Sequence, residues 1–154
     1  MNATIEKHAV AKILLTSPAF RDGDIIPVKY AAIGRNIRPA FEIKGMPEDC
    51  KSLAMVMEDN NSSTGPRIHW LAWNLPVIPQ LRENDKAGVC GKNDFGTNKF
   101  VGPMTTLWAH RYTFHVYGLD ALLDISSTSG INELRHAMNE HLVAVGRMDV
   151  LFKN

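Results

Sequence analysis

Three side chains with rings that can exchange protons lie in two apolar runs of the chain. His69 lies in the run Ile68–Leu75, and His110 and Tyr112 begin a second run further along. An ionisable ring inside a buried strand costs free energy unless it is hydrogen-bonded or used. Because side chains alternate along an extended strand, His110 and Tyr112 point to the same side. If the two strands lie side by side, the two imidazoles and the phenol line one small polar pocket.

Two acidic side chains could complete this group. Asp59 follows the apolar run Leu53–Met57, and Asp94 lies in a polar segment before His110. A carboxylate, two imidazoles and a phenol can bind a small anion when the rings donate hydrogen bonds and the carboxylate shares a proton with the ligand. Ordinary explanations stay open: a histidine in a strand often bonds the backbone, and both aspartates can be turn residues.

Metal chemistry is an alternative use of the same side chains. Asp59, His69 and His110 could form a two-histidine, one-carboxylate iron site, but their spacing matches no recognised ligand pattern. We therefore expect no bound metal and no other cofactor. Nucleophilic catalysis is less favoured, because the chain has no Gly-x-Ser-x-Gly elbow and no serine or cysteine beside a histidine. The other four histidines, His115 among them, receive no role.

The composition is that of one globular domain. Of the 154 residues, 45% are hydrophobic and 21% are charged, which is typical of a folded chain with a substantial core. We therefore expect a single domain over residues 1–154. Seventeen basic and sixteen acidic residues leave a formal charge of +1. This balance argues against nucleic acid as a partner, because nucleic acid needs clustered lysines and arginines.

The cysteines and the N-terminal segment bear on the compartment. Cys50 and Cys90 are too few for the disulfide framework of a secreted domain, and neither has a partner at zinc-site spacing. Charged residues interrupt the segment Met1–Lys12, which argues against a signal peptide. No run approaches the ~20 apolar residues of a membrane span. We expect a cytoplasmic protein without integral membrane association.

Hydrophobic patterning predicts a mostly β protein. The continuous apolar runs at Leu53–Met57 and Ile68–Leu75 are typical of central strands that are covered on both faces. The run His110–Tyr117 predicts a strand with two different faces. Ile26–Ala32 and Met148–Phe152 are further strand candidates.

One helix is predicted, over Ile131–Val145, where apolar residues recur at three- and four-residue spacing. Ser129 is placed as its N-cap, and Gly146 is placed to end it. Leu119–Leu123 could add a helical turn. Several strands with long connections and one late helix favour an all-β, sandwich-like domain with minor α content.

The polar segment Arg82–Ala109 is long and rich in glycine and asparagine. A long loop without secondary structure is uncommon in a compact domain and is usually functional. Because this segment leads directly into His110, we expect it to form a wall of the pocket that His110 faces.

A set of short motifs runs in order along nearly the whole chain. These are Ser17-Pro18-Ala19-Phe20, Gly34-Arg35-Asn36-Ile37-Arg38-Pro39, Asp59, His69-Trp70, Trp73-Asn74-Leu75-Pro76, Asn93-Asp94-Phe95-Gly96, Gly102-Pro103, His110-Arg111-Tyr112 and Val116-Tyr117-Gly118-Leu119-Asp120. Each motif is unspecific alone. In this order and spacing they resemble the phosphatidylethanolamine-binding protein family, and more narrowly its bacterial and archaeal branch called Raf-kinase-inhibitor-like.

The resemblance implies a large antiparallel sheet packed against a smaller one, with C-terminal helical elements. It also implies a shared pocket for small anions such as phosphate, acetate or phospholipid head groups. By resemblance the pocket positions are Asp59, His69, Gly102, Pro103, His110 and Tyr112, to which the residue pattern adds Asp94. The Gly102 backbone has no side chain in the way and could approach an anion closely.

The sequence departs from the family pattern in three places. Asn60-Asn61 stand where Pro-Asp is usual, Met104–Ala109 replaces a stretch with cysteine and prolines, and Arg38-Pro39-Ala40 replaces Ser-Pro-Pro. The first change removes a carboxylate from the implied pocket. It predicts anion binding that strengthens toward mildly acidic pH, and an Asn61→Asp variant that binds more weakly near neutrality.

Three functions follow from these features. We favour a non-catalytic binding protein for a small ligand that carries a phosphate or a carboxylate. The alternatives are a regulatory protein that modulates a kinase or protease partner through the pocket rim, and a hydrolase or metal-dependent enzyme that uses the same pocket. No sequence feature marks a surface for a protein partner, and a homodimer is left open.

Overall fold

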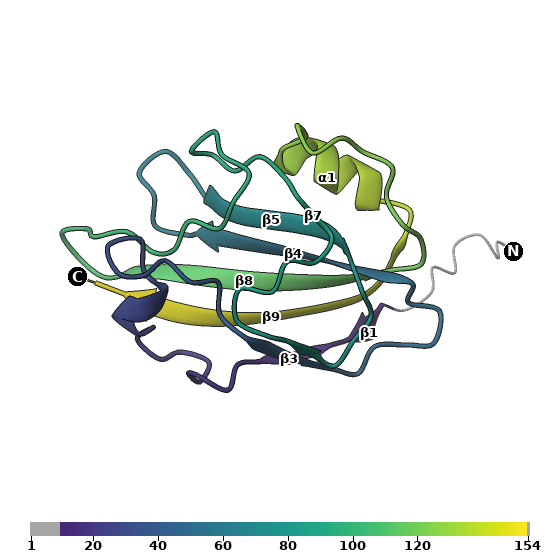
Figure 1. Ribbon diagram of the computed structural model, residues 1–154, viewed down its shortest axis with the longest axis horizontal. Helices are drawn as coiled ribbons and strands as arrows, with labels where there is room; N and C mark the ends of the chain where they lie inside the picture. Colours follow the sequence, from purple (N-terminus) through teal and green to yellow (C-terminus); the bar gives the residue numbers. More distant parts are fainter. Residues whose placement is uncertain (1–9, 154) are drawn as a thin grey trace, which may run out of the picture.

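Two β-sheets form the body of the protein (Figure 1). The computed structural model describes residues 10–153, so most of the segment Met1–Lys12 lies outside the described residues. The elements are β1 (Ala11–Lys12), β2 (Leu14–Thr16), η2 (Val28–Tyr30), β3 (Phe41–Lys44), β4 (Ser52–Asp59), β5 (Arg67–Leu75), β6 (Gln80–Leu81), β7 (Val89–Cys90), β8 (His110–Leu119), α1 (Ile131–Met138) and β9 (Leu142–Phe152).

The large sheet has the strand order β1-β9-β8-β4-β5-β7, and the small sheet has the order β2-β3-β6. The long strands β9, β8, β4 and β5 are antiparallel neighbours, whereas β1 joins β9 in parallel. The outer edge of β9 also bonds a second segment, because Ile25 bridges to Leu151 and the Asp22 carboxylate accepts the N–H of Asp149 at 2.7 Å. The predicted all-β class with minor α content is confirmed, with one parallel strand pair at the edge.

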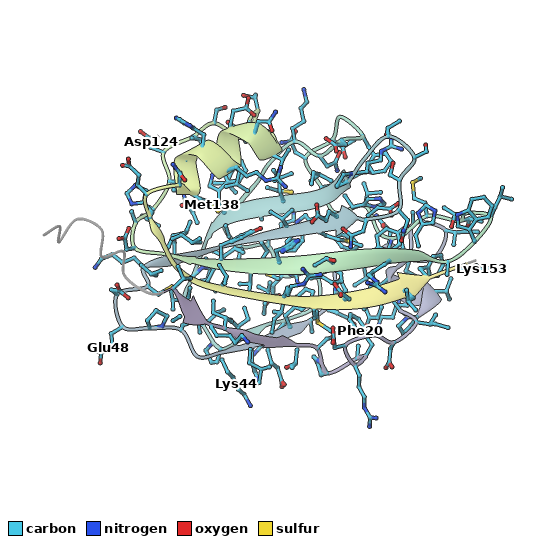
Figure 2. All side chains as sticks on the ribbon, turned by 180° about the vertical axis from the view of Figure 1, so that it is seen from behind. Phe20, Lys44, Glu48, Asp124, Met138 and Lys153 are labelled. Atoms are coloured by element: carbon cyan, nitrogen blue, oxygen red, sulfur yellow. The ribbon has the colours of Figure 1, made fainter. Side chains whose placement is uncertain are left out.

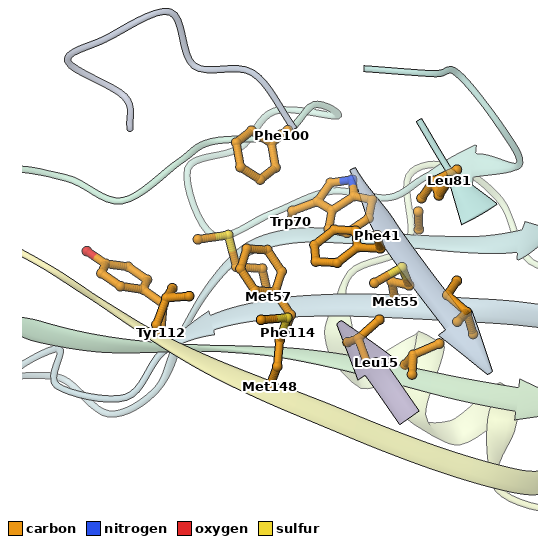
Figure 3. Packing of buried hydrophobic residues seen from close by; sticks show 14 of the residues in the cluster. Leu15, Phe41, Met55, Met57, Trp70, Leu81, Phe100, Tyr112, Phe114 and Met148 are labelled. Carbon is orange, nitrogen blue, oxygen red and sulfur yellow. The ribbon is translucent and has the colours of Figure 1, made fainter. Parts of the chain in front are cut away.

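The main core fills the space between the two sheets (Figure 3). Leu15 and Phe41 of the small sheet pack there against Met55 of β4 and Phe114 of β8. The rings of Phe41 and Phe114 meet edge to face with their centroids 4.9 Å apart. Each large apolar side chain buried in this way contributes about 1.5–3 kcal/mol to stability. The inner face of the large sheet is therefore fixed by apolar packing everywhere except at its polar end.

The other face of the large sheet is covered by α1. Leu134 and Met138 of the helix are buried against Val56 of β4 and Trp73 of β5. Met138 lies on the side of the helix that faces the sheet (Figure 2). This second layer explains why β5 is apolar on both faces, as predicted. No helix within residues 10–153 is long and apolar enough to cross a membrane.

The predicted helix over Ile131–Val145 is too long, because α1 ends at Met138 and the chain then enters β9. Leu142 and Val145 match helical spacing, but they pair with β8 instead, so tertiary pairing overrides the local pattern. The residue before the helix is Gly130, not Ser129, and its N–H donates to the Glu133 carboxylate at 2.8 Å.

Gly146, predicted to end the helix, lies in the middle of β9. A Cβ atom there would come within 2.4 Å of the carbonyl oxygen of Ile13. The glycine therefore allows the N-terminal segment to approach the sheet closely.

Two other predicted elements are absent from the structure. Ile26–Ala32 is not a strand: it contains the 3₁₀ turn η2, in which Tyr30 N–H donates to Pro27, and Pro27 cannot donate to a sheet. Leu119–Leu123 is not helical, because Leu119 ends β8 and Leu123 bonds the side chain of Asn74. The segment Arg82–Ala109 contains one short strand, β7, which pairs with β5.

Candidate functional site

The polar end of the large sheet begins with a hydrogen-bonded pair of a histidine and a carboxylate between β4 and β8. Asp59 is the last residue of β4, and the strand register sets it opposite Tyr112. The Nδ1 atom of His110, the first residue of β8, lies 2.8 Å from Oδ2 and 3.1 Å from Oδ1 of Asp59. Because a carboxylate accepts, Nδ1 carries the proton. The Nε2 atom of His110 is therefore the ring nitrogen that remains for a ligand.

His69 reaches the same group of rings through a β-bulge. The register between β4 and β5 passes from Met57 opposite Trp70 to Glu58 opposite Ile68, so His69 is an extra residue in β5. A bulge changes the direction in which side chains point. As a result His69 and its neighbour Trp70 both lie on the core side of the sheet, with the His69 ring against Tyr112.

The strands of His69 and His110 do not lie side by side, because β4 separates β5 from β8. The rings nevertheless converge on Tyr112. The ring centroids of His69 and Tyr112 are 5.2 Å apart, and those of His110 and Tyr112 are 6.5 Å apart. We call His69, His110, Tyr112 and Asp59 the ring cluster. Four residues from three strands thus form one polar group beside an apolar core.

The neutral form of His69 has a defined tautomer. Its Nδ1 atom lies 2.9 Å from the carbonyl oxygen of Val101 and 3.1 Å from that of Gly102. Both are acceptors, so Nδ1 carries the proton and Nε2 keeps a lone pair. The side chain is almost wholly buried, with 2% of the residue exposed. Burial lowers the pKa of His69 below its ordinary value of 6.5, although the bonds to the two carbonyls oppose this shift.

Tyr112 supplies a neutral phenol. Its oxygen accepts the backbone N–H of Met104 at 3.2 Å, and burial raises the pKa of Tyr112 to about 12. The hydroxyl therefore keeps its proton at neutral pH and can donate it in a hydrogen bond. The labelled ring of Tyr112 lies at the end of the core, with its oxygen directed away from the apolar side chains (Figure 3).

Gly102 and Pro103 lie beside the ring cluster, but Gly102 is a glycine for a different reason from the one expected. A Cβ atom on Gly102 would lie 1.9 Å from the carbonyl oxygen of Tyr30. The Gly102 N–H already donates to Oδ1 of Asn36 at 2.7 Å. The carbonyl of Pro103 accepts the N–H of Ala32. Gly102 thus holds His69 through its carbonyl while its own N–H is occupied, and Pro103 ties this segment to Ala32.

Asp94 is not part of the ring cluster. Its Oδ2 atom accepts the N–H of Ile68 at 2.7 Å, and its own N–H donates to the Ile68 carbonyl. This exposed carboxylate therefore fixes the start of β5. Its neighbour Phe95 contacts the site instead, since its ring centroid lies 5.0 Å from that of His69. Sequence reasoning missed Phe95, although it follows Asp94 in the motif that was noted.

The segment Arg82–Ala109 contacts two members of the ring cluster: Phe95 and Val101 lie against His69, and Met104 bonds Tyr112. Its last part is exposed, including Leu107 and Trp108. Within the ring cluster His110 is the most accessible member, with 12% of its side chain exposed. Solvent therefore reaches the ring cluster chiefly at His110.

Asn60 and Asn61 do not line the ring cluster with their side chains. The side-chain Oδ1 of Asn61 accepts the N–H of Arg111 at 2.7 Å, while the Asn61 backbone N–H donates to Oδ1 of Asp59 at 2.9 Å. Asn60 donates to the hydroxyl of Thr113 at 2.7 Å. The two side-chain amides thus bond β8, and the backbone N–H of Asn61 supports Asp59. Among residues 10–153, no three His, Cys, Asp or Glu side chains are grouped to hold a metal ion.

Comparison with known proteins decides the family. A family model described as phosphatidylethanolamine-binding protein matches residues 16–153. The chain belongs to this family. A UPF0098 protein of Archaeoglobus fulgidus is 34% identical over 158 residues, which cover 97% of this chain and 54% of that protein. The chain therefore spans about half the length of that curated relative.

Solved structures of the family agree in fold. A putative phosphatidylethanolamine-binding protein homologue from Chlamydia trachomatis has a TM-score of 0.89 at 31% identity, over 93% of this chain and 98% of that chain. The Escherichia coli protein YbcL has a TM-score of 0.83 at 22% identity, over 92% of this chain and 98% of that one. The predicted family and its arrangement of a large and a small sheet are confirmed.

Proposed function

We propose that this protein is a non-catalytic binding protein for a small oxyanion, a phosphate or a carboxylate, held in the ring cluster. The observation that carries the proposal is the pair of Asp59 and His110. The Asp59 carboxylate holds the imidazole of His110 with Nδ1 turned toward it, and this leaves Nε2 for a ligand. When His110 is protonated, Nε2 becomes a charged donor, and such hydrogen bonds to anions are roughly twice as strong as neutral ones.

The other rings define the kind of anion that fits. The hydroxyl of Tyr112 is a donor, whereas neutral His69 offers only a lone pair at Nε2. An oxyanion that carries a proton of its own suits this set, since its charged oxygens can accept from Tyr112 and His110. Its proton can then be donated to His69. A monoprotonated phosphate, free or as a phosphomonoester head group, has this combination.

Membership of the family supports binding over catalysis. Within residues 10–153, the imidazoles of His69 and His110 bond two carbonyls and one carboxylate, and no serine, threonine or cysteine hydroxyl or thiol is bonded to either ring. The ring cluster therefore lacks the pairing of a nucleophile with a base that defines acyl-transfer sites.

Calorimetric titration with inorganic phosphate and with phosphoethanolamine tests the proposal, using His110→Gln against His115→Gln. His115 pairs with Glu58 in a similar way on the other face of the sheet, so it controls for loss of an imidazole. We expect His110→Gln to weaken phosphate binding about tenfold or more, the free energy of one charge-assisted hydrogen bond. His115→Gln should bind like the wild type. No binding of either probe by the wild type, or equal losses in both variants, would overturn the proposal.

A further inference from the structure

A cavity lies beside β5 and β7, outside the ring cluster. Its volume is about 470 Å³, within the range of small-molecule sites. The apolar side chains of Trp70, Leu75, Leu81 and Phe100 line it, and Trp70, Leu81 and Phe100 are seen together in Figure 3. None of the four ring-cluster residues lines this cavity. The two places are therefore separate, although His69 and Trp70 are neighbours in the bulge of β5.

A buried guanidinium forms the polar wall of this cavity. Arg38 is only 5% exposed and its charged group lies 5.8 Å from the ring centroid of Trp70. Nη1 donates to the carbonyl of Pro39 at 2.6 Å, and Nη2 donates to the carbonyl of Asp85 at 2.7 Å. An arginine has five N–H donors, so three remain beyond these two bonds.

The charge of Arg38 has no close counter-ion. Across residues 10–153, no carboxylate lies within 4.0 Å of its guanidinium. Asp85 and Glu83 attract it from a greater distance, but Glu83 is engaged by Lys29 at 3.0 Å and by the hydroxyl of Tyr30 at 2.6 Å. Burial of a cation without a paired anion is costly. An anion in the cavity would remove that cost.

The charged residues at the rim of the cavity also favour a negatively charged ligand. Lys86 and Lys99 line the cavity and are exposed, and Asp85 is the one acidic residue among the lining residues. With Arg38 this gives three cations against one anion. The apolar walls, in contrast, call for a hydrocarbon body rather than a bare inorganic ion.

We propose that this cavity is a second ligand site, which binds an organic carboxylate with a flat apolar body. The carboxylate lies against the free N–H groups of Arg38, whose planar fork matches two carboxylate oxygens. The body packs against the cavity walls that Trp70 and Phe100 form; these two rings already meet edge to face with their centroids 6.1 Å apart, so the body lies over them and not between them. The lysines at the rim attract the anion from solvent. This site is independent of the anion site proposed for the ring cluster.

Benzoate and benzyl alcohol are the probes, because they share a ring and differ in charge. We expect benzoate to bind about tenfold more tightly than benzyl alcohol, as measured by calorimetry and by tryptophan fluorescence. Inorganic phosphate in excess should not displace benzoate. Equal affinity of the two probes would overturn the proposal. Displacement by phosphate, or loss of benzoate binding in His110→Gln, would do the same by assigning benzoate to the ring cluster.

Two variants locate the benzoate site. Arg38→Gln should abolish the preference for benzoate over benzyl alcohol. Since Arg38 also bonds two carbonyls, a variant at the exposed rim, Lys99→Glu, keeps the test decisive if Arg38→Gln does not fold. Lys99→Glu should weaken benzoate binding several-fold, whereas Lys12→Glu, an equal charge change on β1 at the opposite edge of the large sheet, should not. Equal effects of the two lysine variants would contradict a site in this cavity.

Discussion

The strands β4 and β8 build two pairs of histidine and carboxylate, one on each face of the same sheet. His110 bonds Asp59 toward the core side, and His115 bonds Glu58 on the opposite side, both at 2.8 Å. The parity of the residue numbers explains the two faces, because His110 and His115 differ by an odd number of positions, as do Asp59 and Glu58. The two pairs are alike in distance and differ in what surrounds them.

The outer pair is balanced by its neighbours. The His115 ring stacks on Tyr117 with centroids 5.9 Å apart. The hydrogen bond from His115 lowers the pKa of Glu58, and the guanidinium groups of Arg135 and Arg147 add to this shift. The inner pair is surrounded instead by the phenol of Tyr112 and the buried imidazole of His69. The two pairs therefore teach that the distance between a histidine and its carboxylate does not make a binding site. The residues around the pair decide whether it is a candidate site.

The largest difference between the inner and the outer pair should come from removing the carboxylate of each. Asp59→Ala leaves a buried imidazole without its partner, which costs about 3 kcal/mol of unfolding free energy, and it should abolish phosphate binding because His110 is no longer held. Glu58→Ala should cost less and leave phosphate binding intact. Urea denaturation and phosphate titration measure both effects. Equal effects of the two variants would remove the distinction between the faces.

The second-largest effect is the loss of unfolding free energy that His69 causes at acidic pH. Because the folded-state pKa of His69 lies below 6.5, the unfolded chain takes up the proton first as the pH falls. Stability is therefore lost from about pH 6.5 down to the folded-state pKa, at up to about 1.4 kcal/mol per pH unit. A His69→Asn variant, which can still donate to Val101, should lack this part of the loss. Denaturation curves between pH 5 and 7.5 test this, and parallel acid losses in both proteins would contradict it.

A smaller effect is expected at Glu58. Its folded-state pKa is below the ordinary 4.5, so its contribution is present above about pH 4.5 and is lost as the pH falls through the folded-state value. Glu58→Gln should lower the unfolding free energy at pH 7 by about 1 kcal/mol, with the difference shrinking toward pH 3. Thermal melts at the two pH values provide the measurement. A difference that is constant with pH would mean that the charge of Glu58 is not involved.

The smallest effect should be that of Asn61→Asp. The sequence predicts weaker anion binding near neutrality, and the structure limits its size, because the side-chain oxygen already accepts the N–H of Arg111. A carboxylate can keep that bond while its charge stays behind Asp59. We expect phosphate affinity to fall less than about threefold at pH 7, the scale of an exposed charge. A tenfold loss in calorimetry would place the side chain next to the ligand.

The long central strands were predictable from the sequence because their apolar runs are long. The runs at Leu53–Met57, Ile68–Leu75 and His110–Tyr117 all lie in strands. The short strands, such as β1 and β6, have two residues each and carry no periodicity that could reveal them. The helix was overextended because Leu142 and Val145 satisfy helical spacing, and only pairing with β8 decides otherwise.

The candidate site was predictable in its members but not in its construction. The side on which His110 and Tyr112 lie follows from strand alternation. The position of His69 depends on a bulge, and a bulge depends on the register against β4, which no local pattern encodes. The importance of Phe95 and the occupied N–H of Gly102 likewise follow from contacts between segments far apart in the chain.

The outer edge of β9 has a consequence for folding. Residues 11–12 pair with residues 144–145, and Ile25 bridges to Leu151. During synthesis residues 11–25 must wait until β9 has been made, more than a hundred residues later, and such distant pairings form slowly. Once docked, the two early segments cover backbone groups that would otherwise recruit another chain. The same contacts that delay completion of the fold therefore protect its last strand from edge-to-edge aggregation.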